Sequence, residues 1–233
     1  MDTREQTHEH ELARGWAIGM AIAAGLVRLI PHPLNFTPVG ALALFGGARL
    51  RSVFAWVLPL SIMAVSDLLL FVLQDHQDRT LLTFAFNPWV YASFVLAVLW
   101  GRLLLRNGSA ARVAAVSVLV SVQFFLLTNL GVWMADVRNS PPLPEGTVVA
   151  WKEIPGLPAP VPDHYAHTLT GLLTCYAVAL PFAGSNAPPL GFSGNQLLGD
   201  LFYSAVLFGA YAWLRRGAPL PRRAHELDAA RMP

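Results

Sequence analysis

One acid inside an apolar run is the residue of this chain best placed to do chemistry. Asp67 is the sole charged residue in the stretch VFAWVLPLSIMAVSDLLLFVL, residues 53–73. An ionised acid is costly in hydrocarbon, so it usually faces a protein interior or a water-filled cavity. Asp67 therefore predicts a polar site inside an apolar bundle. Its partner there is either a ligand or another helix.

Three further polar or aromatic residues lie near the ends of apolar stretches. Asn129 and Trp133 are one helical turn apart near the end of 112–135, so they share a face. Asp200 comes early in 197–214, where it could instead stabilise the start of a helix. The topology argued below places all three with Asp67 in the outer half of the bundle. Together they either line a cavity for a substrate or tie helices to one another.

A proline-rich turn adds a fifth candidate. The segment PHPLNFTP, residues 31–38, restricts the backbone at three prolines and carries Asn35 and Thr37. Asn35 could hydrogen-bond a substrate, or either side chain could cap the helix that follows. Gly46 and Gly47 do not belong to a P-loop, because the Lys-Ser/Thr ending of that motif is missing.

The sequence argues against several classes of function. It contains no nucleotide fingerprint, HExxH motif or nucleophile elbow, so we expect no enzyme and no cofactor. With Cys175 as its single cysteine, the chain can form no intrachain disulfide. His164 and His167 could meet on one helical turn, but two histidines alone are a weak sign of a metal, so we expect no metal site. The small net charge of +2 predicts no nucleic-acid partner.

Composition indicates a membrane protein. The chain is 55% hydrophobic and only 13% charged, with a mean hydropathy of +0.48, whereas soluble domains are about 25% charged. Six apolar segments predict an all-α integral membrane bundle of about six transmembrane helices. These segments are 15–31, 38–50, 53–73, 88–106, 112–135 and 197–214. The second is short for a span, so it is tilted, re-entrant or packed inside the bundle.

The apolar segment 165–182 decides the topology. If it is a short helix rather than a span, both termini share one side of the membrane. That side then holds every basic residue except Arg28, Arg79, Arg138 and Lys152. The positive-inside rule therefore favours six spans with both termini cytoplasmic, in a bacterial cytoplasmic membrane.

The same topology predicts a simple domain organisation. We expect a cytoplasmic segment at 1–14, one transmembrane domain over 15–216 and a cytoplasmic tail at 217–233. The proline-rich stretch 136–163 is expected to be an extracytoplasmic loop or surface lid. Small residues at four-residue spacing, Ala17, Ala21 and Gly25, predict a face that packs closely, either within the bundle or against a partner protein.

Five segments together resemble an uncharacterised family of small bacterial membrane proteins. They are RLIPHPLNFTPVGALALFGGARL (28–50), SDLLL (66–70), FFLLTNLGVW (124–133), HTLTGLLTCYAVALPF (167–182) and LLGDLFYSAVLFG (197–209). The stretch NFTPVGALALFGGA is the most distinctive of them.

The layout is more distantly similar to the S components of energy-coupling factor (ECF) transporters. That resemblance implies six helices, cytoplasmic termini and an outward-facing site for a vitamin-like nutrient. Some S components end with a short apolar segment, a proline and a Gly-Asp pair that opens the last helix, as in Pro181 followed by Gly199-Asp200. The first helix of S components docks on an energising transmembrane subunit through an Ala-x-x-x-Ala face, which Ala17 and Ala21 fit.

These observations lead to one leading expectation and one alternative. The leading one is a substrate-binding or uptake component for a small nutrient, with an energising transmembrane and ATPase module docked on its first helix. Its predicted substrate-binding residues are Asn35, Asp67, Asn129, Trp133 and Asp200. The alternative is an accessory structural subunit of a larger membrane complex that binds no ligand of its own.

Overall fold

In a computed structural model of the chain, the residues that the structure describes are mostly helical. They are 11, 15–16, 18–19, 22–23, 26–29, 33, 35–50, 53–73, 87–139, 151–152, 161–162, 164–179 and 191–217. The helices are α2 (Val39–Arg49), α3 (Phe54–Leu73), α5 (Pro88–Leu104), α6 (Ala110–Asn139), α7 (Leu169–Ala179) and α8 (Gly191–Gly217). Two-residue strands β1 (Trp151–Lys152) and β2 (Val161–Pro162) pair antiparallel, and the described residues between 11 and 29 are helical.

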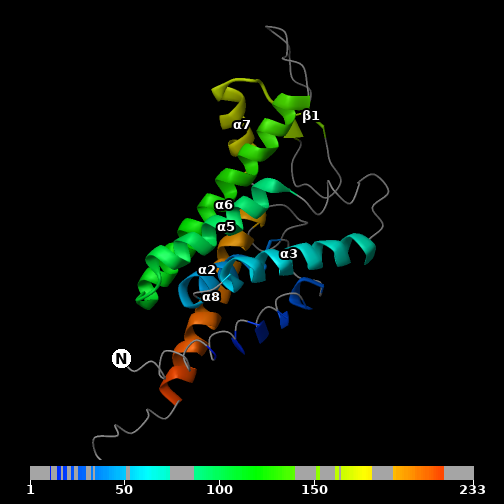
Figure 1. The fold of residues 1–233 in the computed structure, drawn as a ribbon. Helices are drawn as coiled ribbons and strands as arrows, with labels where there is room; N and C mark the ends of the chain where they lie inside the picture. Colours follow the sequence, from blue (N-terminus) through cyan, green and yellow to red (C-terminus); the bar gives the residue numbers. More distant parts are fainter. Residues whose placement is uncertain are drawn as a thin grey trace, which may run out of the picture.

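The short helix α2 forms the centre of the core. Its residues from Val39 to Gly47 are all buried, and it packs against α3, α5, α6 and α8. At 11 residues it rises only about 16 Å, which is too short to cross a bilayer. Of the three alternatives for this segment, the structure shows the one in which it lies packed inside the bundle (Figure 1).

Glycines allow α2 and α5 to approach until their backbones touch. A Cβ atom on Gly47 would collide with the carbonyl oxygen of Val98, and one on Gly101 would collide with that of Leu44. The two collisions come from opposite helices, so the contact is reciprocal. Packing of small residues rather than large interdigitating side chains therefore fixes this helix pair.

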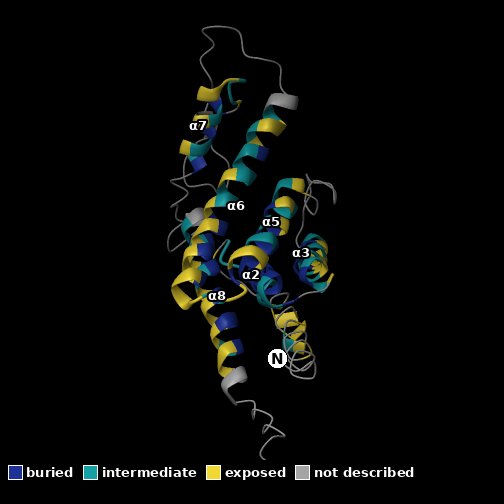
Figure 2. Cartoon of the chain, turned by 60° about the vertical axis from the view of Figure 1, so that its left-hand side comes forward, coloured by how far each residue is buried: buried dark blue, intermediate teal, exposed yellow. Residues whose placement is uncertain are grey.

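The helices α5, α6 and α8 surround α2, and α3 crosses them. In Figure 1, α3 lies across the direction of α6 and α8, and in Figure 2 it is seen nearly end on while α6 and α8 run up the picture. The contact between α6 and α7 lies at the far end of α6 from the other helices. Exposed residues follow the outer sides of α6 and α8 (Figure 2).

Among the residues that the structure describes, two helices are long and apolar enough to cross a membrane: Phe54–Leu73 and the stretch Ala110–Asp136 of α6. The helices α2, α5 and α7 are apolar but shorter. The described part of the chain is thus mainly helical with two helices capable of spanning, and the number of six spans stays a prediction.

Some predicted boundaries were wrong. The helix α8 begins at Gly191 rather than residue 197, so Asp200 lies more than two turns inside the helix and not at its start. The helix α6 continues to Asn139, so the predicted loop 136–163 loses its first residues to a helix. In 165–182 the described residues form a helix over Leu169–Ala179, whose 11 residues are fewer than a bilayer span needs.

Candidate functional site

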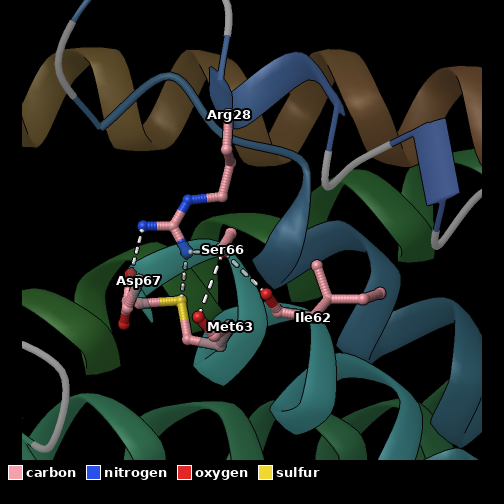
Figure 3. Close-up of polar contacts among 5 residues, drawn as sticks. All are labelled: Arg28, Ile62, Met63, Ser66 and Asp67. Atoms are coloured by element: carbon pink, nitrogen blue, oxygen red, sulfur yellow. Dashed lines mark hydrogen bonds and ion pairs between the residues drawn. The ribbon is translucent and has the colours of Figure 1, made fainter. Parts of the chain in front are cut away.

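Asp67 is paired with a cation from the first helical segment. The guanidinium of Arg28 donates from Nη2 to Oδ1 of Asp67 at 2.8 Å. Its Nη1 donates to Ser66 Oγ and to Met63 Sδ, each at 2.7 Å. Figure 3 shows Arg28 reaching onto one face of α3, where these three partners lie. Both charged side chains are nearly buried, with 12% of Arg28 and 10% of Asp67 exposed.

Ser66 completes this group by bonding to its own helix. Its hydroxyl lies 2.6 Å from the carbonyl oxygen of Ile62 and 3.0 Å from that of Met63 (Figure 3). With this bond the hydroxyl donates to α3 while it accepts from Arg28. The charged pair is therefore held on α3 by hydrogen bonds to Ser66 and Met63 in addition to its own contact.

Asp200 lies in a separate and more deeply buried position between α2, α6 and α8. Its side chain has no exposed surface. Its Oδ2 accepts from Ser121 Oγ at 2.8 Å and from Gln196 Nε2 at 2.9 Å. Its Oδ1 has no hydrogen-bond partner. That oxygen lies so close to Gly40 that a Cβ atom there would overlap it.

A row of small polar side chains continues from Asp200 along the contact between α6 and α8. Ser117 Oγ lies 2.9 Å from Ser204 Oγ and donates to the carbonyl of Val113. Ser121 Oγ lies 3.1 Å from the carbonyl oxygen of Ser117. We call this row the polar seam; all its members are buried. Its residues are Ser117, Ser121, Gln196, Asp200 and Ser204.

The turn that contains Asn35 rests on the same part of α8. The Cβ position of Gly199 lies 3.1 Å from Thr37 N and 3.3 Å from Phe36 Cα. Asn35 has φ 63°, a left-handed conformation that asparagine tolerates better than most residues. The ring of Phe36 lies 5.4 Å from that of Tyr203. Glycine at 199 thus lets this turn lie directly beside Asp200.

Capping does not explain Asn35 or Thr37. The N-cap of α2 is Pro38, and no side chain makes a cap hydrogen bond there. Of the two readings of this turn, the capping one is therefore wrong for this helix. A hydrogen-bonding role for Asn35 toward a ligand is untouched by this result.

Asn129 and Trp133 face a different neighbour, the segment that leads into α7. Trp133 Nε1 donates to the carbonyl oxygen of Ala166 at 3.0 Å. The side-chain amide of Asn129 donates to Phe125 within α6 at 2.8 Å, and its backbone carbonyl accepts from Cys175 Sγ at 3.5 Å. One turn beyond Trp133, Asp136 Oδ2 accepts from the backbone N–H of Tyr165 at 2.6 Å.

The hydroxyl of Tyr165 is held in its protonated form by this packing. The pKa of Tyr165 is raised to about 12, mainly by burial and to a smaller extent by the neighbouring Cys175 and Asp136. His164 Nδ1 lies 3.4 Å from Asp136 Oδ1. In the part of the chain that the structure describes, no three His, Cys, Asp or Glu side chains gather as metal ligands would.

Comparison with known proteins gives one match. The model of a family described as a family of unknown function (DUF6580) matches residues 10–222. The chain belongs to this family. A search of curated proteins and a search of solved structures each found no match. Membership agrees with the expected uncharacterised family, and the likeness to ECF S components remains a prediction.

The five predicted site residues of this DUF6580 protein fall into three sets of contacts. Asp67 bonds to Arg28, and Asn129 and Trp133 bond within α6 and to the α7 region. The turn at Asn35 and the buried Asp200 come together where α2 begins beside α8. The expectation was that Asp67, Asn129, Trp133 and Asp200 are neighbours, but among the described residues no side-chain hydrogen bond or ion pair joins any two of them. The predicted docking residues Ala17, Ala21 and Gly25 lie outside them.

Sequence reasoning on this DUF6580 protein missed two sets of residues. Arg28 was assigned to the outer end of a span rather than paired with an acid. The members of the polar seam were not singled out apart from Asp200, although their spacing carried a signal. Ser117 and Ser121 are four residues apart, as are Gln196, Asp200 and Ser204, so each set lies on one helix face.

Proposed function

We propose that the protein is a multi-pass protein of the bacterial cytoplasmic membrane that binds a small polar nutrient for uptake, as S components do. Support for a membrane location comes from the distribution of apolar and charged side chains between surface and interior, which is opposite to that of soluble proteins. Val72 and Leu73 on α3 are 72% and 70% exposed, whereas Asp200 is fully buried and Asp67 nearly so. Lipid is the solvent that suits such a surface.

The proposed solute site lies at the junction of the 35–37 turn, α2 and α8. The observation that carries it is the Oδ1 atom of Asp200, a buried acceptor that lacks a partner. Buried polar groups in native proteins are nearly always hydrogen-bonded, and exceptions often mark functional positions. Asn35 and Thr37 lie on the turn above Gly199 and would offer further hydrogen bonds. A solute with N–H donors, cationic or heteroaromatic, fits this combination.

In the packed form of the protein the solute site is closed. Asp200 Oδ1 lies against Gly40, so a solute reaches the carboxyl only when the 35–37 turn or α8 moves away from α2. The turn contacts α8 through its backbone beside Gly199 and through the ring of Phe36 against Tyr203. The proposal therefore includes movement of this turn as the step that admits the solute.

Native mass spectrometry of gently purified protein tests the proposal. We expect wild-type protein to carry a small molecule of defined mass, and Asp200→Asn and Asn35→Ala to lose it. Ser61→Ala is the matched control, because Ser61 is exposed on α3 and belongs to no polar group described above. A bare wild-type protein, or a molecule retained equally by all variants, would contradict solute binding at this junction.

The alternative, an accessory subunit without a ligand, has one observation in its favour. Asp67 and Asn129 are both engaged by protein groups, as expected if they hold helices together. The same mass spectra distinguish the two functions. A subunit would retain a protein partner and no small molecule, whereas an uptake component would retain the small molecule whether or not an energising module stays bound.

A further inference from the structure

The environment of Asp200 also bears on its protonation. The side chain is fully buried, and none of the described basic side chains forms an ion pair with it. An ionised carboxylate in such a place keeps the full cost of leaving water, because no opposite charge offsets that cost. Two side-chain hydrogen bonds to Oδ2 stabilise a charge only partly.

The count of hydrogens at Ser121 favours a neutral Asp200. Ser121 Oγ lies within hydrogen-bond distance of Asp200 Oδ2 and of the carbonyl oxygen of Ser117, at 2.8 and 3.1 Å. A hydroxyl has one hydrogen, so it cannot donate fully to two acceptors. If Asp200 carries a proton on Oδ2, that proton is donated to Ser121 Oγ. Ser121 then donates to Ser117, and every contact in the row has a donor and an acceptor.

The remaining amide contact fits the same arrangement. Gln196 Nε2 donates to Asp200 Oδ2 at 2.9 Å, and a protonated carboxyl oxygen still has a lone pair to accept it. The oxygen without a partner, Oδ1, is then the carbonyl oxygen of a neutral acid. An unpartnered neutral carbonyl is far less costly to bury than half of an unpartnered carboxylate.

Other ionisable groups on the packed elements are distant or neutral. Arg49 lies nine residues beyond Gly40 on α2, and Arg112 nine residues before Ser121 on α6, about 14 Å along each helix. On α8 the nearest is Tyr203, whose ring stacks with Phe36 and Phe202. The start of α2 beside Asp200 favours an anion, but a helix dipole offsets only part of the cost of desolvation.

The space at Oδ1 limits what Asp200 binds in the packed form. A single Cβ atom on Gly40 would overlap this oxygen, so neither a hydrated ion nor a side chain fits there without movement. We propose that Asp200 is a proton-binding site that holds an exchangeable proton while α8 is packed on α2 and releases it when the two helices separate. This inference stands apart from solute binding, because protonation is measurable with no solute present.

Infrared difference spectroscopy of the full chain in lipid nanodiscs tests the proposal. We expect wild-type protein at neutral pH to show the carbonyl band of a protonated carboxyl in a nonpolar site. The band should be lost in Asp200→Asn and retained in Asp67→Asn, which removes the other buried acid. Ser121→Ala keeps Asp200 but deletes one hydrogen-bond partner, so the band should shift in frequency without being lost.

Two results would overturn the proposal. One is a wild-type spectrum at neutral pH without a protonated-carboxyl band. The other is a band that stays unshifted in Ser121→Ala and is lost only in Asp67→Asn. Should Asp200→Asn fail to fold, the shift in Ser121→Ala still decides the question. A failure of this test leaves the mass spectra on solute retention unaffected, so the two proposals fail separately.

Discussion

Arg28 and Asp67 are 39 residues apart in sequence, yet their side chains form an ion pair of 2.8 Å that fastens the first helical segment to α3. The same guanidinium also bonds to Ser66 and Met63, so one side chain contacts three positions on a single helix face. A charged pair enclosed by apolar helices is costly to form, but much more costly to break by removing one member.

Replacing one member of this pair should therefore destabilise the protein strongly. We expect Arg28→Gln or Asp67→Asn to cost about 3 kcal/mol, because each leaves an uncompensated charge nearly out of water. The double change Arg28→Met with Asp67→Leu should recover most of that loss. Thermal unfolding in detergent measures the effect, with Ser61→Ala as the control on α3. Equal losses in the single and double variants would contradict this account.

The contact between α2 and α5 gives a second prediction. Gly101→Ala should lower the unfolding temperature, since its methyl group would overlap the backbone of Leu44 and overpacking costs about 1–3 kcal/mol. Gly209→Ala is the matched control on α8, where a Cβ atom meets nothing within 4 Å. There alanine should be neutral or stabilising by up to about 1 kcal/mol. Similar changes in unfolding temperature at both positions would show that they arise from helix propensity and not from the contact between α2 and α5.

An indole hydrogen bond is one of the contacts that attach the α7 region to α6. Trp133→Phe keeps an aromatic ring but removes the donor to Ala166, a loss of about 1 kcal/mol. We expect faster hydrogen exchange of backbone amides in 164–179, with no change in α2. Trp213→Phe is the control, because Trp213 is 72% exposed. Faster exchange throughout the core would instead indicate a general loss of stability.

Alkaline pH should weaken the same region through Tyr165. The pKa of a free tyrosine is 10.0 and that of Tyr165 is about 12, so the folded state favours the protonated phenol. That contribution is complete below pH 10 and is lost as the pH rises toward 12. The unfolding temperature of wild type should fall over this range more steeply than that of Tyr165→Phe. Parallel curves for the two proteins would contradict the prediction.

The single cysteine makes the proposed topology directly testable. Cys175 is buried and donates to Asn129, so Cys175→Ser keeps a donor and yields a chain without thiols. New cysteines placed before residue 15 and after residue 217 can then be labelled in inverted and right-side-out vesicles. We expect both to react with an impermeant reagent from the cytoplasmic side. Labelling of one terminus from each side would exclude an even number of spans.

Helix existence was predicted well because it depends on local apolar runs. The helix predicted over 53–73 is observed as Phe54–Leu73. The helix predicted over 88–106 is observed as Pro88–Leu104, which starts at a proline after the capping Asn87. The start of α8 was predicted six residues late, since the polar and glycine-containing residues 191–196 looked like a loop. In the structure two of them, Asn195 and Gln196, are buried, and tertiary contacts outweigh the low helix propensity of the glycines and Asn195.

The candidate site was predicted only in part because residue types do not specify partners. Asp67 and Asp200 are buried and Asn129 is half-buried. Which helix faces each of them depends on how the helices cross. The pairing of Arg28 with Asp67 and the overlap of Asp200 with Gly40 both require that crossing to be known.

The position of α2 also has a consequence for biosynthesis. This helix is synthesised early, but α8 covers it only after nearly the whole chain has been made. Until then its apolar surface has no protein partner on the side that α8 covers. In the proposed membrane setting, lipid or a membrane insertase would cover this segment of the nascent chain until then. Truncations that remove α8 should accordingly be degraded, even though the two membrane-length helices remain intact.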